Sequence, residues 1–184
     1  MRSHVALLRG INVGGHNKVA MTDLREITTS LGHTEVATYV QSGNVVFSSP
    51  ETDTIRAAEN LERALAERLD VAPAVVVGSR GQLERVIADN PYPEQTNPRC
   101  LHAVFRRQEM DREGIAAVAQ AQQRASDKGS RDQATVVGRT LFLHTPVGLG
   151  RSELARSGTA TQSGTPGTAR NWATVTKLMA LLND

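Results

Sequence analysis

The chain has 184 residues, of which 21 are Lys or Arg and 19 are Asp or Glu, and its formal net charge is +2. This length suits one large domain or two small ones, and the charge is too small to indicate nucleic-acid binding by itself. The single cysteine, Cys100, excludes an internal disulfide and a cysteine-based zinc site. Because the chain has no long apolar run, we expect no membrane partner and take the cytoplasm as the default compartment.

The first part of the chain, residues 1–79, has the patterning of a ferredoxin-like subdomain. Apolar residues spaced three or four apart predict helices, and short apolar or alternating runs predict strands. The expected elements are a strand at 4–9, a helix at 22–31, strands at 36–41 and 45–49, a helix at 53–69 and a strand at 74–78. This β-α-β-β-α-β order is the split-βαβ pattern, so the predicted fold class is α+β.

Residues 80–145 predict a second, smaller α+β subdomain. The expected elements are a helix at 82–88, a strand at 101–106, a helix at 111–125 and a hairpin of strands at 134–137 and 140–144. This α-β-α-β-β order differs from that of the first subdomain. We therefore do not expect the second subdomain to repeat the first.

The last part of the chain changes character twice. Residues 146–169 are rich in Gly, Ser and Thr, which predicts a flexible segment whose most mobile part is 152–167. Residues 170–184 predict a C-terminal helix with one apolar face that must dock on other apolar residues.

A glycine-rich loop follows the first predicted strand and gives the strongest indication of a binding site. Its glycines allow backbone N–H groups to approach an anion, and its flanking cations add positive charge. The loop is not a P-loop, because Lys and Ser/Thr do not follow its last glycine. We expect an ordered loop that binds a phosphate or carboxylate, the alternative being a purely structural connection. The candidate ligand-binding residues are Arg9, Gly10, Asn12, Gly14, Gly15, Asn17 and Lys18.

The run Arg170-Asn171-Trp172 is expected to open the last helix, with Asn171 or Thr168 as its cap. An arginine at a helix N-terminus is unfavourable to the helix dipole, so Arg170 indicates an acidic partner or an anionic ligand. We therefore add Arg170 and Asn171 to the candidate site. We further expect Arg170 to face a cleft shared with the glycine-rich loop.

A tight turn at residues 41–44 joins two of the predicted strands, and its Gly and Asn suit the backbone angles of a hairpin. In a sheet of full-length strands we expect this turn and the glycine-rich loop at opposite ends. A ligand role for Gln41 or Asn44 is therefore less favoured than a structural one.

Other chemistry finds little support in the sequence. The five histidines lack the spacing of a metal site, so we expect no metal, and no catalytic motif appears. Enzyme activity, cofactor and oligomeric state are left open. An RNA- or DNA-binding module is a less favoured alternative, because such modules stack bases on exposed aromatics and the central strands here carry only Phe47. A structural scaffold without a ligand is the third reading.

Several motifs together resemble the family of proteins with domain of unknown function 1697. They are ALLRGINVGG at residues 6–15 with Asn17-Lys18, YVQSGNVVF at 39–47, NPYP at 90–93, GRS at 150–152, and TARNW at 168–172 with Thr174-Val175 and Lys177-Leu178. The resemblance covers nearly the whole chain and implies two α+β subdomains, the first ferredoxin-like, but no activity. Similar sequences carry a more apolar helical segment where residues 153–167 are rich in Ser, Thr and Gly.

Overall fold

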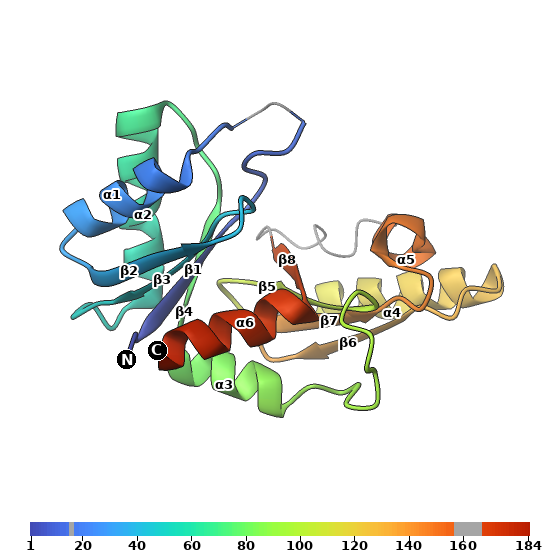
Figure 1. The fold of residues 1–184 in the computed structure, drawn as a ribbon. Coiled ribbons are helices and arrows are strands. Elements are labelled where there is room, and N and C mark those ends of the chain that lie inside the picture. Colours follow the sequence, from blue (N-terminus) through green and yellow to red (C-terminus); the bar gives the residue numbers. More distant parts are fainter. Residues whose placement is uncertain (15–16, 157–166) are drawn as a thin grey trace. The chain divides into compact units, whose positions relative to one another are not determined.

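A computed structural model describes residues 1–14, 17–156 and 167–184 of the chain. The described chain divides into two compact units. Unit 1 comprises Met1–Arg85 and Lys177–Asp184, and unit 2 comprises Val86–Thr176. Each unit contains one four-stranded sheet with antiparallel neighbours (Figure 1).

Unit 1 has the ferredoxin-like strand order that its sequence predicts. Its elements are β1 (His4–Leu8), α1 (Met21–Ser30), β2 (Thr34–Tyr39), β3 (Asn44–Ser48), α2 (Thr54–Leu69), β4 (Val75–Ser79) and the start of α3 (Arg80–Ala88). The sheet order is β2-β3-β1-β4, so each βαβ crossover skips one strand. The predicted α+β class is therefore confirmed.

The core of unit 1 lies between its sheet and helices α1 and α2, which cover one face (Figure 1). Alternate residues of the central strands point to this face, as the two-residue period of a strand requires. The buried cluster includes Ala6, Leu8, Val45, Phe47, Val75 and Val77 from the strands, and Leu24, Ile27, Ala58, Leu61 and Leu65 from the helices. The side chain of Asp53 caps α2 by accepting hydrogen bonds from the N–H groups of Ile55 and Arg56.

Unit 2 contains the end of α3, β5 (Leu101–Phe105), α4 (Arg112–Asp127), β6 (Gln133–Val137), β7 (Thr140–His144), a 3-10 turn η1 (Leu149–Arg151), α5 (Glu153–Arg156), β8 (Thr168–Asn171) and the start of α6 (Trp172–Asn183). Its sheet order, β6-β7-β5-β8, matches that of unit 1 strand for strand. The expectation that the second subdomain does not repeat the first is therefore wrong: β5-α4-β6-β7-α5-β8 is a second β-α-β-β-α-β unit.

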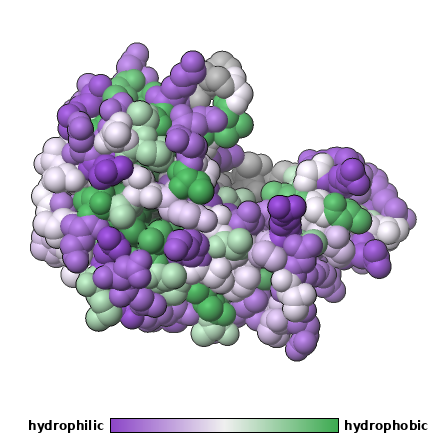
Figure 2. Space-filling model, in the orientation of Figure 1, coloured by the Kyte–Doolittle hydropathy of each residue, from purple (hydrophilic) through white to green (hydrophobic). Residues whose placement is uncertain are grey.

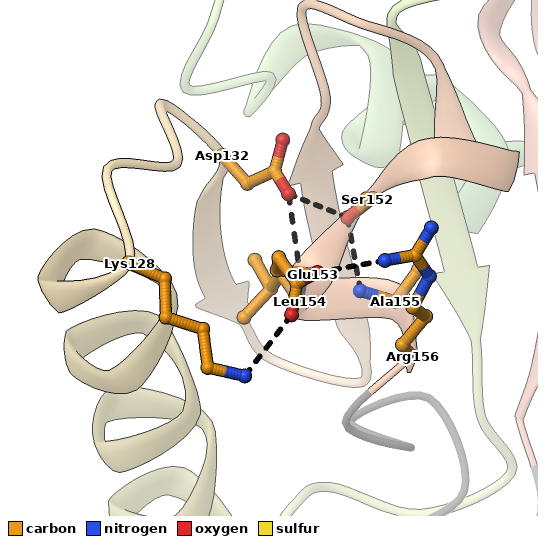
Figure 3. A network of polar contacts seen from close by, with 7 residues as sticks. All are labelled: Lys128, Asp132, Ser152, Glu153, Leu154, Ala155 and Arg156. Carbon is orange, nitrogen blue, oxygen red and sulfur yellow. Dashed lines mark hydrogen bonds and ion pairs between the residues drawn. The ribbon is translucent and has the colours of Figure 1, made fainter.

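The two elements that complete this repeat were not predicted because each spans only four residues. Helix α5 is too short for a helical period to show, and β8 carries three polar residues among its four. Polar contacts fix α5 in place (Figure 3). Asp132 Oδ2 accepts hydrogen bonds from Ser152 Oγ at 2.7 Å and Leu154 N at 3.4 Å, and Ser152 Oγ accepts one from Ala155 N at 2.9 Å.

The expectation of mobility over residues 152–167 falls mainly outside the described part of the chain, since 157–166 are not described. At its start, Ser152 is fully buried and residues 153–156 form α5. The mobility of the remainder stays a prediction.

The last helix begins at Trp172, so Arg170 and Asn171 do not open it but end strand β8. The expected cap is confirmed, because Asn171 Oδ1 accepts a hydrogen bond from Thr174 N at 2.8 Å. Unit 1 shows the same arrangement: α3 follows β4 directly, and Ser79 Oγ accepts a hydrogen bond from Gln82 N at 3.2 Å. In each unit, the last strand of the sheet in chain order therefore passes directly into a capped helix.

The visible surface is mostly hydrophilic or intermediate, with apolar residues in small scattered groups (Figure 2). None of the described helices combines the length and apolar character needed to cross a membrane.

Candidate functional site

The glycine-rich loop and the β2–β3 turn lie at the same end of the unit 1 sheet. Strand β3 is antiparallel to both β1 and β2, and Leu7 pairs with Asn44. The last residues of β1 therefore lie beside the first residues of β3, where Leu8 N–H donates to Gly43 O at 2.8 Å. The expectation that the two motifs lie at opposite ends is wrong, because β1 and β2 run in the same direction on either side of β3.

Asn12 holds the loop and the turn together. Its side-chain N–H groups donate to Val19 O and Gln41 O, both at 2.9 Å, and its Oδ1 accepts from Val19 N at 2.9 Å. Its backbone N–H donates to Asn17 O at 3.1 Å. Both side-chain N–H groups of Asn12 are thus committed within the protein, which makes it a positioning residue for the loop.

The sign of φ alternates along the loop. Gly10, Asn12 and Gly14 have positive φ values of 67°, 56° and 61°, whereas the residues between them do not. Alternating left- and right-handed residues are typical of backbone nests, in which successive N–H groups turn towards one concavity and can bind an anion. Gly10 and Gly14, at the two ends of this run, therefore suit the positive φ values that the loop needs at these positions.

The turn packs closely against the same loop. Gly43 has φ 77°, and a Cβ placed on it would lie 2.7 Å from Ile11 Cδ1 and 2.8 Å from Leu8 Cβ. Only glycine fits this position, both for its conformation and for the space. Asn44 is fully buried, and its side chain donates to Tyr39 O and Ser42 Oγ at 2.9 and 3.1 Å, which agrees with a structural reading of the turn.

The remaining loop candidates differ in exposure. Arg9 is half-buried directly after β1, where its backbone N–H donates to Ala74 O at 2.9 Å, whereas Lys18 is exposed. Asn17 is exposed, has φ 47°, and donates from its side chain to Gly10 O at 3.3 Å. The candidate Gly15 lies outside the described residues.

Arg170 belongs to unit 2 and is only 8% exposed. Its Nη1 donates to Thr168 Oγ1 at 2.7 Å and to Ala169 O at 2.9 Å. Burial lowers its pKa to about 10, because the charged guanidinium has lost much of its hydration. The sequence predicts a cleft between Arg170 and the glycine-rich loop. Because Arg170 belongs to unit 2 and the loop to unit 1, this cleft stays a prediction.

Sequence reasoning missed a buried pair of histidines at the other end of the unit 1 sheet. His4 and His33 are 5% and 7% exposed, and their rings lie 5.6 and 4.5 Å from the ring of Phe47. Burial lowers the pKa of both histidines. The two are 29 positions apart in the chain, so no local pattern joins them, although His4 shares the two-residue period of Ala6 and Leu8.

This cluster also bears on base stacking. Phe47 is 1% exposed and belongs to the helix-covered core, so it offers no surface on which a base could stack. Among the described residues, no group of three or more His, Cys, Asp and Glu is arranged to hold a metal ion.

Comparisons with known proteins agree with this fold. The structure of a conserved bacterial protein, SP0830 from Streptococcus pneumoniae, is similar to this chain with a TM-score of 0.74 and 23% sequence identity, over 98% of each chain. None of the curated proteins compared with the chain matches it. The family of proteins of unknown function DUF1697 matches residues 1–142. The chain therefore belongs to the DUF1697 family.

Proposed function

We propose that the protein binds a small anionic ligand, bearing a phosphate or a carboxylate, at the loop of residues 10–18. The observation that carries this proposal is the positive φ of Gly10, Asn12 and Gly14, because left-handed residues in a loop favour a concavity lined by backbone N–H groups. The N–H group of Asn12 is not one of these donors, since it donates to Asn17 O. Arg9 and Lys18 flank the loop and add positive charge.

The way the loop is held also supports the proposal. Asn12 joins it to the β2–β3 turn through Gln41 O, and Ile11 is buried at 1% exposure beneath Gly43. A loop whose shape is fixed before the ligand arrives loses less conformational entropy on binding. A simple spacer between β1 and α1 has no need of this many specific contacts.

The proposal can be tested with the full chain labelled with ¹⁵N and titrated with inorganic phosphate and, separately, with acetate. We expect saturable shifts of the Gly10 and Gly14 amide signals. Gly14→Ala should weaken binding, because the added Cβ disfavours the positive φ on which the nest depends. Gly32→Ala is the matched control, since Gly32 also has a positive φ and open space around it but lies in the α1–β2 turn.

A second pair of variants tests the charge. Lys18→Gln should weaken phosphate binding, whereas Arg25→Gln, which removes another exposed cation, on α1, should leave it unchanged. Titrations in which neither anion shifts the loop amides, or in which the two glycine variants behave alike, would overturn the proposal.

A further inference from the structure

Strand β6 forms one edge of the unit 2 sheet, as β2 forms one edge of the unit 1 sheet. The two strands hold the same position in the repeat, because the sheet orders are β6-β7-β5-β8 and β2-β3-β1-β4. An edge strand carries backbone N–H and C=O groups that its own sheet does not use, and these groups can pair with another chain. The two equivalent edges can therefore be compared directly.

The edge at β2 is protected against such pairing. The register of β2 with β3 shifts between Thr34 and Ala37, and Glu35, within this irregular stretch, has φ 52°. Ser48 Oγ donates to the carboxylate of Glu35, and Arg2 Nε donates to its backbone carbonyl. A bulge that carries a charged residue is a common means of blocking a sheet edge. Strand β2 is therefore poorly suited to receive a further strand.

The edge at β6 has none of these features. Its five residues, Gln133–Val137, pair with β7 without a shift in register. They include no charged residue and no proline, and Thr135, Val136 and Val137 are β-branched. The last four residues of the strand are only partly buried. Strand β6 is therefore a regular edge with high β propensity.

The backbone of β6 supplies groups that a further strand could use. Ala134 N–H donates to Gln122 Oε1 at 2.6 Å, so it points away from β7. In an antiparallel ladder alternate residues point their backbone groups to the same side, so those of Val136 point outwards as well. Among the described residues, neither the N–H nor the C=O of Val136 nor the C=O of Ala134 makes a hydrogen bond. The edge therefore presents a donor and two acceptors at the spacing of a β-ladder.

The charges at the two ends of β6 indicate what kind of strand would suit this edge. Arg131 and Arg139 flank the strand, and both are at least partly exposed. Arg139 donates from Nη1 to the carbonyl of Arg107 at 3.0 Å, which leaves its positive charge in place. Asp132 is buried, and its carboxylate accepts from Ser152 Oγ. The two ends of the edge therefore favour a partner that carries carboxylates.

The same charges disfavour a second copy of this chain as the partner. In the symmetrical antiparallel register that pairs Ala134 with Val136 of another copy, Arg131 of each copy lies opposite Arg139 of the other. Like charges directly opposite each other destabilise a ladder. An acidic segment therefore suits the edge better than β6 of a second copy does.

We propose that the edge of β6 is a docking site for an extended acidic segment of another protein. The segment adds a strand to the unit 2 sheet, pairs its backbone with Ala134 and Val136, and places its carboxylates beside Arg131 and Arg139. Backbone hydrogen bonds supply affinity in this mode of recognition, and the flanking charges supply selectivity. The surface lies in unit 2, so the proposal does not depend on the anion site at the glycine-rich loop.

The test uses the full chain labelled with ¹⁵N. The probe is a synthetic peptide with blocked ends in which Thr and Val alternate and a Glu stands at each end, and the comparison peptide has Lys in place of both Glu residues. The Glu peptide should shift the Val136 amide saturably and slow its hydrogen exchange, whereas the amides of β2 should not respond. The Lys peptide should bind at least fivefold more weakly.

Two pairs of variants separate the contributions of charge and backbone. Arg131→Gln should weaken binding of the Glu peptide at least twofold, whereas Arg63→Gln, which removes an exposed cation from α2, should leave it unchanged. Val136→Pro removes the outward N–H group and should weaken binding at least fivefold, followed at the Ala134 amide. Val136→Thr keeps that N–H group and should change binding less than twofold. The arginine pair tests the site without altering the strand.

Several outcomes would overturn the proposal. They are no saturable shift at Val136, equal affinities for the Glu and Lys peptides, and equal effects of Arg131→Gln and Arg63→Gln. A dimer in sedimentation without peptide, together with a Val136 amide shift that depends on protein concentration, would assign the edge to a second copy instead.

Discussion

The side-chain amide of Asn12 donates a hydrogen bond to Gln41 O at 2.9 Å and so joins the loop after β1 to the β2–β3 turn. Two sequence motifs that begin far apart in the chain therefore meet at one end of the first sheet. The same side chain also spans the loop to Val19. The shape of the loop thus depends strongly on one residue.

Replacing that residue should destabilise unit 1. Asn12→Ala removes three side-chain hydrogen bonds and leaves the Val19 N–H and Gln41 C=O groups without their partner, so we expect a loss of about 2–4 kcal/mol in the free energy of unfolding. Asn17→Ala is the control, because Asn17 also has a positive φ but makes one exposed side-chain hydrogen bond at 3.3 Å. Urea denaturation should show a clearly smaller loss for the control, and equal losses would contradict the structural role of Asn12.

Unit 1 could be predicted from the sequence because each of its elements is long enough to show a period. The apolar stripe of α2 and the buried runs of β1 and β4 all lie within one or two residues of their predicted bounds. The hydrogen bond of Asn12 with Gln41 could not be predicted from either motif alone, because it depends on the relative directions of β1 and β2, which only the predicted β-α-β-β-α-β order implies. Those directions follow from the βαβ crossover and not from either motif.

Unit 2 shows the opposite case. Strands β5, β6 and β7 and the long helix α4 were predicted. The second β-α-β-β-α-β unit was not recognised, because α5 and the start of β8 lie in a segment rich in Gly, Ser and Thr. The burial that fixes α5 comes from Leu154 and from the carboxylate of Asp132, twenty-two residues apart. Such long-range contacts leave no local pattern in a single sequence.

Gly43 should tolerate no side chain. In Gly43→Ala the new Cβ would overlap Ile11 and Leu8, and the residue would also keep an unfavourable φ of 77°. We expect a loss of roughly 3 kcal/mol or more, since overpacking adds about 1–3 kcal/mol to the backbone cost. Gly138→Ala is the matched control at the β6–β7 turn, where φ is 54° and nothing lies within 4 Å, and it should cost about 1 kcal/mol. Thermal unfolding that ranks the two variants alike would contradict the close packing at Gly43.

The histidine pair should make unit 1 sensitive to acid. Burial is the main cause that lowers the pKa of both His4 and His33, and the charge of Glu51 opposes it. The unfolded chain therefore binds protons at higher pH than the folded one. Above about pH 6.5, the pKa of a histidine in the unfolded chain, the two rings do not reduce the free energy of unfolding. As the pH falls below this value and through the lower pKa of the folded state, the free energy of unfolding decreases.

For the native chain, the urea concentration at the midpoint of unfolding should fall as the pH is lowered from 7.5 to 5. His33→Phe should reduce this fall, because it removes one of the two rings that become protonated. A pH dependence identical in the variant and the native chain would exclude His33 as a source. His144→Gln serves as the control, because that ring lies in unit 2 and is outside this cluster.

The contacts of Ser152 predict how α5 is held. Ser152→Ala removes the hydroxyl that donates to Asp132 Oδ2 at 2.7 Å and caps α5 by accepting from Ala155 N (Figure 3). The buried carboxylate then keeps only the 3.4 Å contact with Leu154 N, and its Oδ1 already has no partner in the described chain. We expect the free energy of unfolding to fall by about 2–3 kcal/mol, because the variant loses the cap of α5 and also leaves the buried Asp132 side chain with fewer hydrogen bonds.

Glu153→Gln provides the comparison one residue further on. It removes the ion pairs of Glu153 with Lys128 and Arg156, at 3.2 and 2.7 Å, but both partners are more than half exposed and Glu153 itself is one-third exposed. Exposed pairs contribute little, so this variant should cost less than about 1 kcal/mol. Hydrogen exchange of the Leu154 and Ala155 amides should quicken strongly in Ser152→Ala and only slightly in Glu153→Gln. The reverse order would show that the surface ion pairs, and not the buried Asp132–Ser152 contact, hold α5 in place.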